Sequence, residues 1–206
     1  MIRLFIRRCR FLLFGFGLLF VLGCASSPPS RFYTLSALQA GGRGPGEFPS
    51  DQDFTIVVGP IQFPEYLNRA EIVTRSSRNK ITLSEFDLWA GSLTEDFSRV
   101  LAENLSVLLS TESVIVYPGP RSSLAQYRIT MDVIRFDGSL GGDVSLIARW
   151  GILGGKERKL VFGRKSVIIE PSGAQGYEAM VAANSRALEK LSREIAEAIK
   201  TLAKSS

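Results

Sequence analysis

Apolar and polar residues alternate along three stretches in the second half of the chain, at residues 127–133, 144–150 and 160–169. Successive side chains of a strand point to opposite faces, so each stretch predicts a β-strand with one packed face and one wetter face. In the third stretch Val167 and Ile169 fall on the opposite parity from the first apolar residues, which predicts a bulge. Because the connections are short and rich in glycine, we expect an antiparallel meander.

Two other stretches place their apolar residues at the spacing of a helix. The first covers residues 97–108, and Ser92 with Glu95 forms a capping box in front of it. Phe86 and other apolar residues upstream continue the same stripe, so the start of this helix is left open. The second stretch, at residues 177–202, combines an apolar stripe with charged flanks and predicts a long amphipathic helix.

Shorter apolar runs predict the remaining strands. They occupy residues 32–35, 54–59, 72–75, 80–83 and 114–117. Residues 39–50 hold four glycines and two prolines and predict a loop. Together these elements predict one α+β domain over residues 31–206, with a mostly antiparallel sheet and two amphipathic helices packed on one face.

The first 23 residues have the regions of an export signal. Four arginines precede a twelve-residue apolar run, which at about 1.5 Å per helical residue is shorter than the ~30 Å hydrocarbon core. We therefore expect a cleaved signal peptide over residues 1–23 rather than an uncleaved anchor. Gly23 and Cys24 end the run in a way that resembles the bacterial lipobox, whose cysteine thiol receives a diacylglyceryl group. We expect cleavage between Gly23 and Cys24, lipid attachment at Cys24, and a tether over residues 24–30.

The cysteine count and the charge distribution agree with this interpretation. The only other cysteine, Cys9, lies in the predicted signal peptide, so the mature chain has no partner for an intramolecular disulfide. The net charge of +5 also comes from this segment, because the residues beyond it carry 21 basic and 20 acidic side chains. Without a basic surface in the folded part, we expect no nucleic-acid partner.

Residue types suited to catalysis are sparse. Histidine is absent, which removes Ser-His-Asp and Cys-His pairs and most zinc sites. Asp132, Asp137 and Asp143 could hold Ca²⁺ across a hairpin, although ordinary turn and strand-edge positions are the favoured interpretation. Trp89 and Trp150 are expected in the core. Serine and lysine are numerous, so a Ser–Lys dyad stays open, but the sequence predicts no enzyme, no metal and no cofactor.

Short motifs follow one another in a definite order along nearly the whole mature chain. They are Phe32-Tyr33-Thr34-Leu35, Val58-Gly59-Pro60, Pro64-Glu65-Tyr66-Leu67, Ile72-Val73-Thr74-Arg75, Trp89-Ala90, Leu101-Ala102-Glu103-Asn104-Leu105-Ser106, Phe136-Asp137-Gly138, Arg149-Trp150, Gly176-Tyr177 and Leu191-Ser192-Arg193-Glu194-Ile195. In this order the chain resembles the auxiliary lipoproteins of ABC-type, MCE-associated transport systems, the PqiC-like family. Gly91-Ser92 departs from the family, which often has proline there.

The resemblance implies a non-catalytic lipoprotein that faces the periplasm from the outer membrane. Ala25 after the lipidated cysteine agrees with sorting to that membrane. The implied partner is an MCE-domain conduit protein of an ABC-type transporter, with a phospholipid or another hydrophobic molecule as cargo and the ATPase on another chain. A homo-oligomer is compatible with the sequence. Two alternatives remain, a structural envelope lipoprotein without a transport role and an independent periplasmic enzyme.

Overall fold

A computed structural model describes residues 28–39 and 55–205, apart from residues 121, 124 and 156. The predicted signal peptide, Gly23, Cys24 and nearly all of the predicted loop lie outside the described residues. The elements in chain order are β1 (Arg31–Tyr33), β2 (Ile56–Gln62), the 3-10 turn η1 (Glu65–Leu67), β3 (Glu71–Ser77), β4 (Lys80–Trp89), α2 (Leu93–Leu109), β5 (Val114–Val116), β6 (Tyr127–Gly138), β7 (Asp143–Gly154), β8 (Lys159–Pro171) and α3 (Tyr177–Ser205).

The strands form one mixed sheet, so the α+β class is confirmed. Strands β6, β7 and β8 make the predicted antiparallel meander, and β3 with β4 makes a second antiparallel pair. The remaining pairings are parallel, with β2 between β5 and β6, β1 beside β4, and a short contact of β3 with β6. The hydrophobic pattern finds strands but not their neighbours, so these parallel pairings could not be predicted from it.

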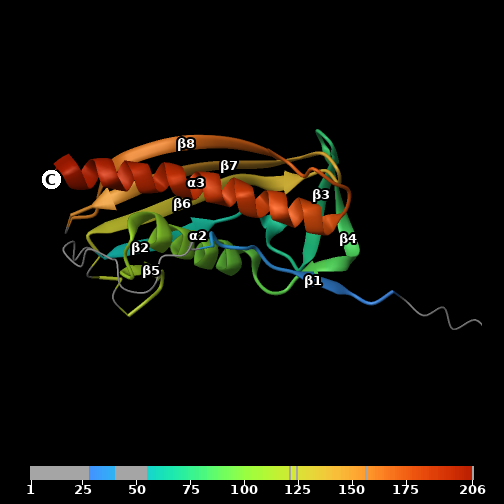
Figure 1. The fold of residues 1–206 in the computed structure, drawn as a ribbon, viewed down its shortest axis with the longest axis horizontal. Coiled ribbons are helices and arrows are strands. Elements are labelled where there is room, and N and C mark those ends of the chain that lie inside the picture. Colours follow the sequence, from blue (N-terminus) through green and yellow to red (C-terminus); the bar gives the residue numbers. More distant parts are fainter. Residues whose placement is uncertain (1–27, 40–54, 121, 124, 156, 206) are drawn as a thin grey trace, which may run out of the picture.

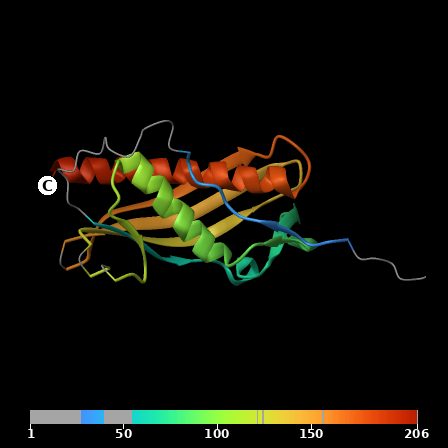
Figure 2. The same cartoon turned by 60° about the horizontal axis from the view of Figure 1, so that its bottom comes forward.

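Both helices cover the same face of the sheet (Figures 1 and 2). Helix α2 packs against β2 and β5, helix α3 against the meander, and the two helices also contact each other. The core between these layers includes a trio of aromatic rings, in which Phe97 lies edge-on to both Phe63 and Phe136 with centroids 5.2 and 5.3 Å away. Trp89 and Trp150 are buried in the core, as predicted.

The structure settles where the first helix begins. Ser92 is the N-cap, and its hydroxyl accepts a hydrogen bond from the Glu95 amide, which confirms the serine half of the predicted capping box. Phe86 belongs to strand β4, so the apolar stripe upstream of Ser92 is strand and not helix. Trp89 of β4 reaches the core from an extended strand, as it would from a helix, and hence periodicity alone left this boundary open.

The predicted side-chain parity of β8 is wrong. Val167 and Ile169 are each 58% exposed, whereas Ile168 is buried. The irregularity lies earlier in the strand, where the register with β7 shifts between the partners of Phe162 and Leu160. The buried face of β8 includes polar residues, which have hydrogen-bonding and ion-pair partners on β7 and α3. Because these buried residues are polar, the sequence pattern assigned the wrong face of β8 to the core.

These partners form a chain of hydrogen bonds through the meander. The Trp150 indole donates to the Ser166 hydroxyl at 2.9 Å, and that hydroxyl donates to the Glu194 carboxylate of α3 at 2.5 Å. Further along β8, Glu170 forms ion pairs with Lys190 and Arg186 of α3. The buried polar residues of β8 therefore attach the strand to the long helix.

We expect Ile168→Ala to lower the free energy of unfolding by about 2–4 kcal/mol, because it leaves a cavity under α3. Val167→Ala and Ile169→Ala should each change it by less than about 0.5 kcal/mol, since both side chains are exposed. Urea unfolding of the chain from Ser30 onward measures all three variants. A larger loss for Val167→Ala than for Ile168→Ala would restore the parity predicted from the sequence.

Candidate functional site

Two buried carboxylates of the described chain each accept four hydrogen bonds, and the first is Asp137, near the end of β6. Arg75 of β3 donates to both of its oxygens, at 2.9 and 2.7 Å. Arg135 adds a third hydrogen bond at 2.8 Å, and the hydroxyl of Tyr66 in η1 adds a fourth at 2.8 Å. The Asp137 side chain is fully buried, so this carboxylate depends on these donors to replace water.

The ionisation of this cluster follows from its donors. Burial alone would raise the pKa of Asp137, but the hydrogen bonds from Arg75, Arg135 and Tyr66 outweigh burial and hold that pKa below its ordinary value. Burial and the contact with Asp137 raise the pKa of Tyr66 to about 12, so its hydroxyl stays protonated and continues to donate. A carboxylate held ionised by four donors is a poor general base, and it serves as a structural junction.

The residues on either side of Asp137 fit the same junction. Phe136 points to the opposite face of the strand and joins the aromatic trio in the core. Gly138 pairs with Thr74 of β3 and approaches the start of β7 closely. A Cβ on Gly138 would lie 2.5 Å from the Asp143 carbonyl oxygen, which leaves room for glycine alone. The motif Phe136-Asp137-Gly138 thus combines a core ring, a buried ion pair and a close backbone approach.

A second buried carboxylate, Asp87, attaches strand β1 to the domain. Arg31 donates to both of its oxygens at 2.7 and 2.8 Å, and Tyr33 and Ser84 donate further hydrogen bonds at 2.8 and 3.0 Å. The hydrogen bonds from Arg31 are the main reason why the pKa of Asp87 lies below its ordinary value. Strand β1 is the first element after the predicted tether, so Asp87 holds the point where the tether meets the fold.

A third polar junction connects the helix layer. The Asn104 side chain of α2 accepts a hydrogen bond from the Leu38 amide at 2.7 Å and donates to the Ser192 hydroxyl of α3 at 3.1 Å. Several of the sequence motifs that carry the family resemblance therefore meet in space at Asp137, Asp87 and Asn104. No local signal in the sequence reveals these junctions, because the partners that connect different elements lie 54 to 88 residues apart.

The three aspartates considered as calcium ligands have different surroundings. Asp137 is engaged by arginines, Asp132 is exposed and faces Arg149 at 3.7 Å, and Asp143 is exposed at the start of β7. Among the described residues no group of three or more acidic, cysteine or histidine side chains could hold a metal ion. Nor, in that part of the chain, is a serine hydroxyl hydrogen-bonded to a lysine amine.

A surface hollow of about 430 Å³ lies at the start of α2. Of its two carboxylates, Glu95 and Asp96, the second accepts hydrogen bonds from the Leu35 amide and the Thr34 hydroxyl, and it also pairs with Arg99. Asp96 therefore fixes the segment after β1 and is not free to act on a substrate. Over the described residues, no helix is both long and apolar enough to cross a membrane.

The sequence profile of the ABC-type transport auxiliary lipoprotein components matches residues 33–196. Because this match covers most of the chain, the protein belongs to that family. It is thus an auxiliary lipoprotein component of ABC-type transport.

Individual relatives agree with this assignment. The chain is 27% identical over 133 residues to the intermembrane transport lipoprotein PqiC of Escherichia coli K12, a stretch that covers 64% of this chain and 68% of PqiC. A crystal structure of an uncharacterised protein matches with a TM-score of 0.68 at 21% identity, over 84% of this chain and 99% of the other. A crystal structure of a Xanthomonas campestris protein matches with a TM-score of 0.60 at 16% identity, over 80% and 92%. These two structures support the fold alone.

We expect Asp137→Asn to lower the free energy of unfolding at pH 7 by about 3 kcal/mol, because it leaves Arg75 and Arg135 without their shared charge. The same change should also make the free energy of unfolding depend less steeply on pH in the acidic range. The pKa of Asp137 is lower in the folded chain than in the unfolded chain, so its ionised form stabilises the fold at pH values above the unfolded pKa near 3.8. This stabilisation disappears as the pH falls through the lower pKa of the folded chain.

Denaturant unfolding of wild type and variant between pH 7 and about pH 2 measures this effect. Asp132→Asn is the matched control, because that carboxylate is exposed and only weakly paired. If the free energy of unfolding of Asp137→Asn fell as steeply with pH as that of the wild type, Asp137 would not be the source of the acid sensitivity.

Proposed function

We propose that the chain is an outer-membrane lipoprotein, anchored by acyl groups on Cys24, that acts as a non-catalytic adapter of an MCE-domain conduit. The family match over residues 33–196 carries this proposal, because it covers most of the chain beyond the predicted tether. The cargo is a phospholipid or another hydrophobic molecule, driven by an ATPase on a different chain. The relative PqiC, described as an intermembrane transport lipoprotein, supports a role between membranes.

The tether restricts where such an adapter can work. The six residues between Cys24 and Arg31 span at most about 20 Å when extended, and β1 then fixes the chain to β4. A conduit that starts at the inner membrane must therefore reach the domain close to the outer membrane. Association into a homo-oligomer around the end of such a conduit is compatible with this placement.

The enzyme alternative is disfavoured by the state of the acidic side chains. Asp87 and Asp137 are buried in saturated ion pairs, and Glu170 and Glu194 are engaged with α3 and β8. A catalytic acid or base needs a perturbed pKa together with access to a substrate. The buried carboxylates instead hold elements together, as an adapter requires.

We expect mass spectrometry of the membrane-extracted protein to show diacylglyceryl-modified Cys24 as its first residue. Cys24→Ser should accumulate as an uncleaved precursor, because the serine hydroxyl does not replace the thiol in lipid transfer. Cys9→Ser serves as control and should be processed normally. An intact Met1 on most wild-type molecules would contradict lipid anchoring.

We expect deletion of this gene to give the same envelope-sensitivity pattern as deletion of the MCE partner gene. The double deletion should be no worse than either single deletion, because both components act in one route. Growth in the presence of detergents and large antibiotics measures the three strains. Additive defects, or no co-purification with an MCE protein after mild extraction, would favour the structural-lipoprotein alternative.

A further inference from the structure

Strand β8 is a long edge strand. Within the described residues it pairs only with β7, so one side of its backbone lacks a strand partner. From Phe162 to Glu170 its pairing with β7 is continuous, and the only irregularity precedes this run. Proteins usually protect such edges with bulges, prolines or short length, because a regular edge offers its free N–H and C=O groups to another strand. These nine residues are long enough to pair with an added strand.

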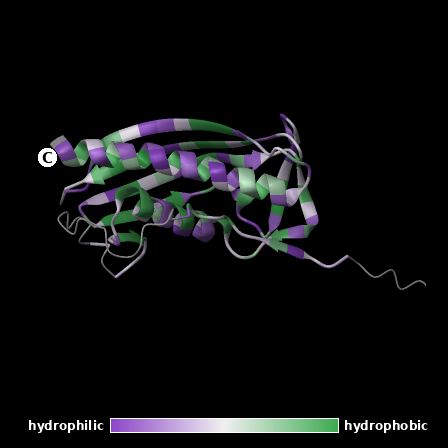
Figure 3. Cartoon of the chain, in the orientation of Figure 1, coloured by the Kyte–Doolittle hydropathy of each residue, from purple (hydrophilic) through white to green (hydrophobic). Residues whose placement is uncertain are grey.

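The exposed side chains of β8 are unusually apolar. Leu160, Val161, Val167 and Ile169 are 45–66% exposed, and the last two share the sheet face that no helix covers. Figure 3 shows the hydrophobic end of β8 after a hydrophilic middle stretch. An added strand would place its outward side chains beside Val167 and Ile169 and remove this apolar surface from water.

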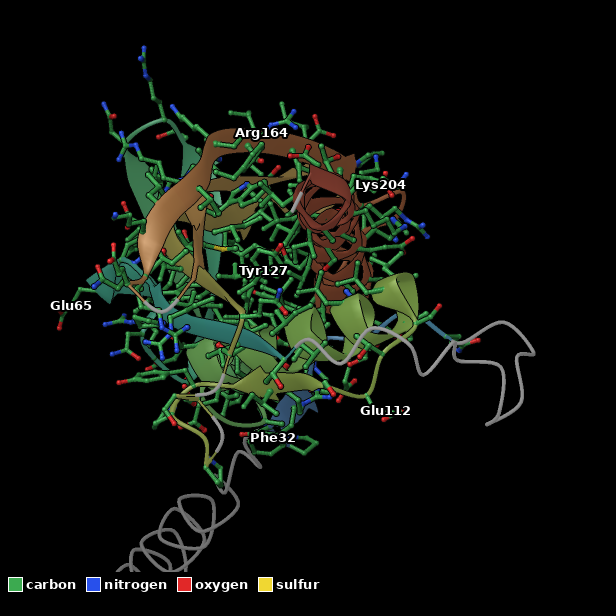
Figure 4. The ribbon with its side chains drawn as sticks, turned by 90° about the vertical axis from the view of Figure 1, so that its left-hand side faces the viewer. Phe32, Glu65, Glu112, Tyr127, Arg164 and Lys204 are labelled. Carbon is green, nitrogen blue, oxygen red and sulfur yellow. The ribbon has the colours of Figure 1, made fainter. Side chains whose placement is uncertain are left out.

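A groove follows the other side of the same edge. It lies between β8 and the second half of α3, with a volume of about 500 Å³, and it is lined by three apolar side chains, Phe162, Ala198 and Leu202, and by five polar or charged ones that include Glu194 and Glu197. Figure 4 places Arg164 of β8 and Lys204 of α3 on the side of the molecule away from Phe32 of β1. The groove and the membrane-proximal strand therefore lie on different sides, and a partner can reach the groove while the lipid is inserted.

The exposed charges of strand β8 itself are all positive, whereas the groove beside it also contains Glu194 and Glu197. The exposed cations of β8 are Lys159, Arg164 and Lys165, and the one acidic residue of the strand, Glu170, is buried against α3. Lys159 pairs with Glu157, and Arg164 lies 3.5 Å from Glu194, but Lys165 makes no ion pair with a described residue. A partner strand with carboxylates at the centre and apolar residues around them complements this pattern.

We propose that the β8 edge and the β8–α3 groove bind an extended segment of the transport partner in which apolar residues alternate with acidic ones. This inference rests on the proposed function, because the occupant is taken to be the MCE-domain protein. The segment would add a strand to the sheet, place apolar side chains in the groove against Phe162 and beside Val167, and bring a carboxylate to Lys165. This is recognition by β-strand addition, in which main-chain hydrogen bonds give affinity and alternate side chains give specificity.

The test uses the full acylated chain and the tagged MCE protein, extracted together in mild detergent. Val167→Glu and Lys165→Glu should each reduce co-purification at least tenfold, because both place a negative charge beside the acidic segment. Leu83→Glu and Lys80→Glu, at exposed positions of β4, are matched controls and should leave it within about twofold. Circular dichroism checks that all four variants are folded.

A photo-crosslinking residue at position 165 identifies the occupant. We expect the crosslink to map to an extended acidic and apolar segment of the MCE protein, and replacing that carboxylate by lysine should restore binding to Lys165→Glu. Retained co-purification in both β8 variants, or crosslinks mainly to a second copy of this chain, would overturn the inference and leave the proposed function standing. If the wild-type chain does not co-purify with the MCE protein, the proposed function itself is refuted, and the inference with it.

Discussion

The buried carboxylate of Asp137 sets the geometry on which the rest of the fold depends. A fully buried charge is tolerated only when donors replace its water, and here the donors come from β3, β6 and the η1 turn. The direct pairing of β3 with β6 is limited to Thr74 and Gly138, so the backbone alone would define this joint weakly. The ion pair of Asp137 with Arg75 therefore fixes how the β3–β4 hairpin meets the meander.

The same hairpin carries the first strand of the folded chain. Asp87 of β4 binds Arg31 and Tyr33 of β1, while β3 on the other side of β4 is held by Asp137. A connection thus runs from the tether through β1, β4 and β3 into the main sheet, with a buried carboxylate at each end of the hairpin. This path ties β1, the first described strand, to the main sheet through buried ion pairs.

The sequence predicted the helices and strands better than it predicted which strands and side chains lie next to one another. The meander followed from the alternation at residues 127–169, and Ser92 with Glu95 marked one of the possible starts of α2, because both signals are local. The parallel neighbours of β2 and the junctions at Asp87 and Asp137 depend on residues far apart in the chain, which no spacing rule connects. The parity of β8 was missed for a different reason. Its buried face carries Ser166 and Glu170, and only the position of α3 shows that these polar residues have partners there.

Strand β8 buries polar residues and exposes apolar ones, and this arrangement is relevant to the proposed function. Burying Ser166 and Glu170 attaches α3 firmly to the edge strand, and it leaves Val167 and Ile169 in contact with water. If stability alone decided the sequence, polar residues at these two positions would avoid exposed apolar surface next to an open edge. The anchored strand β1 and the open edge β8 belong to different parts of the sheet, joined by the rigid path through the hairpin and the meander. In the proposed function, β1 lies on the side of the membrane anchor and β8 receives the partner, and the buried ion pairs join the strands between them.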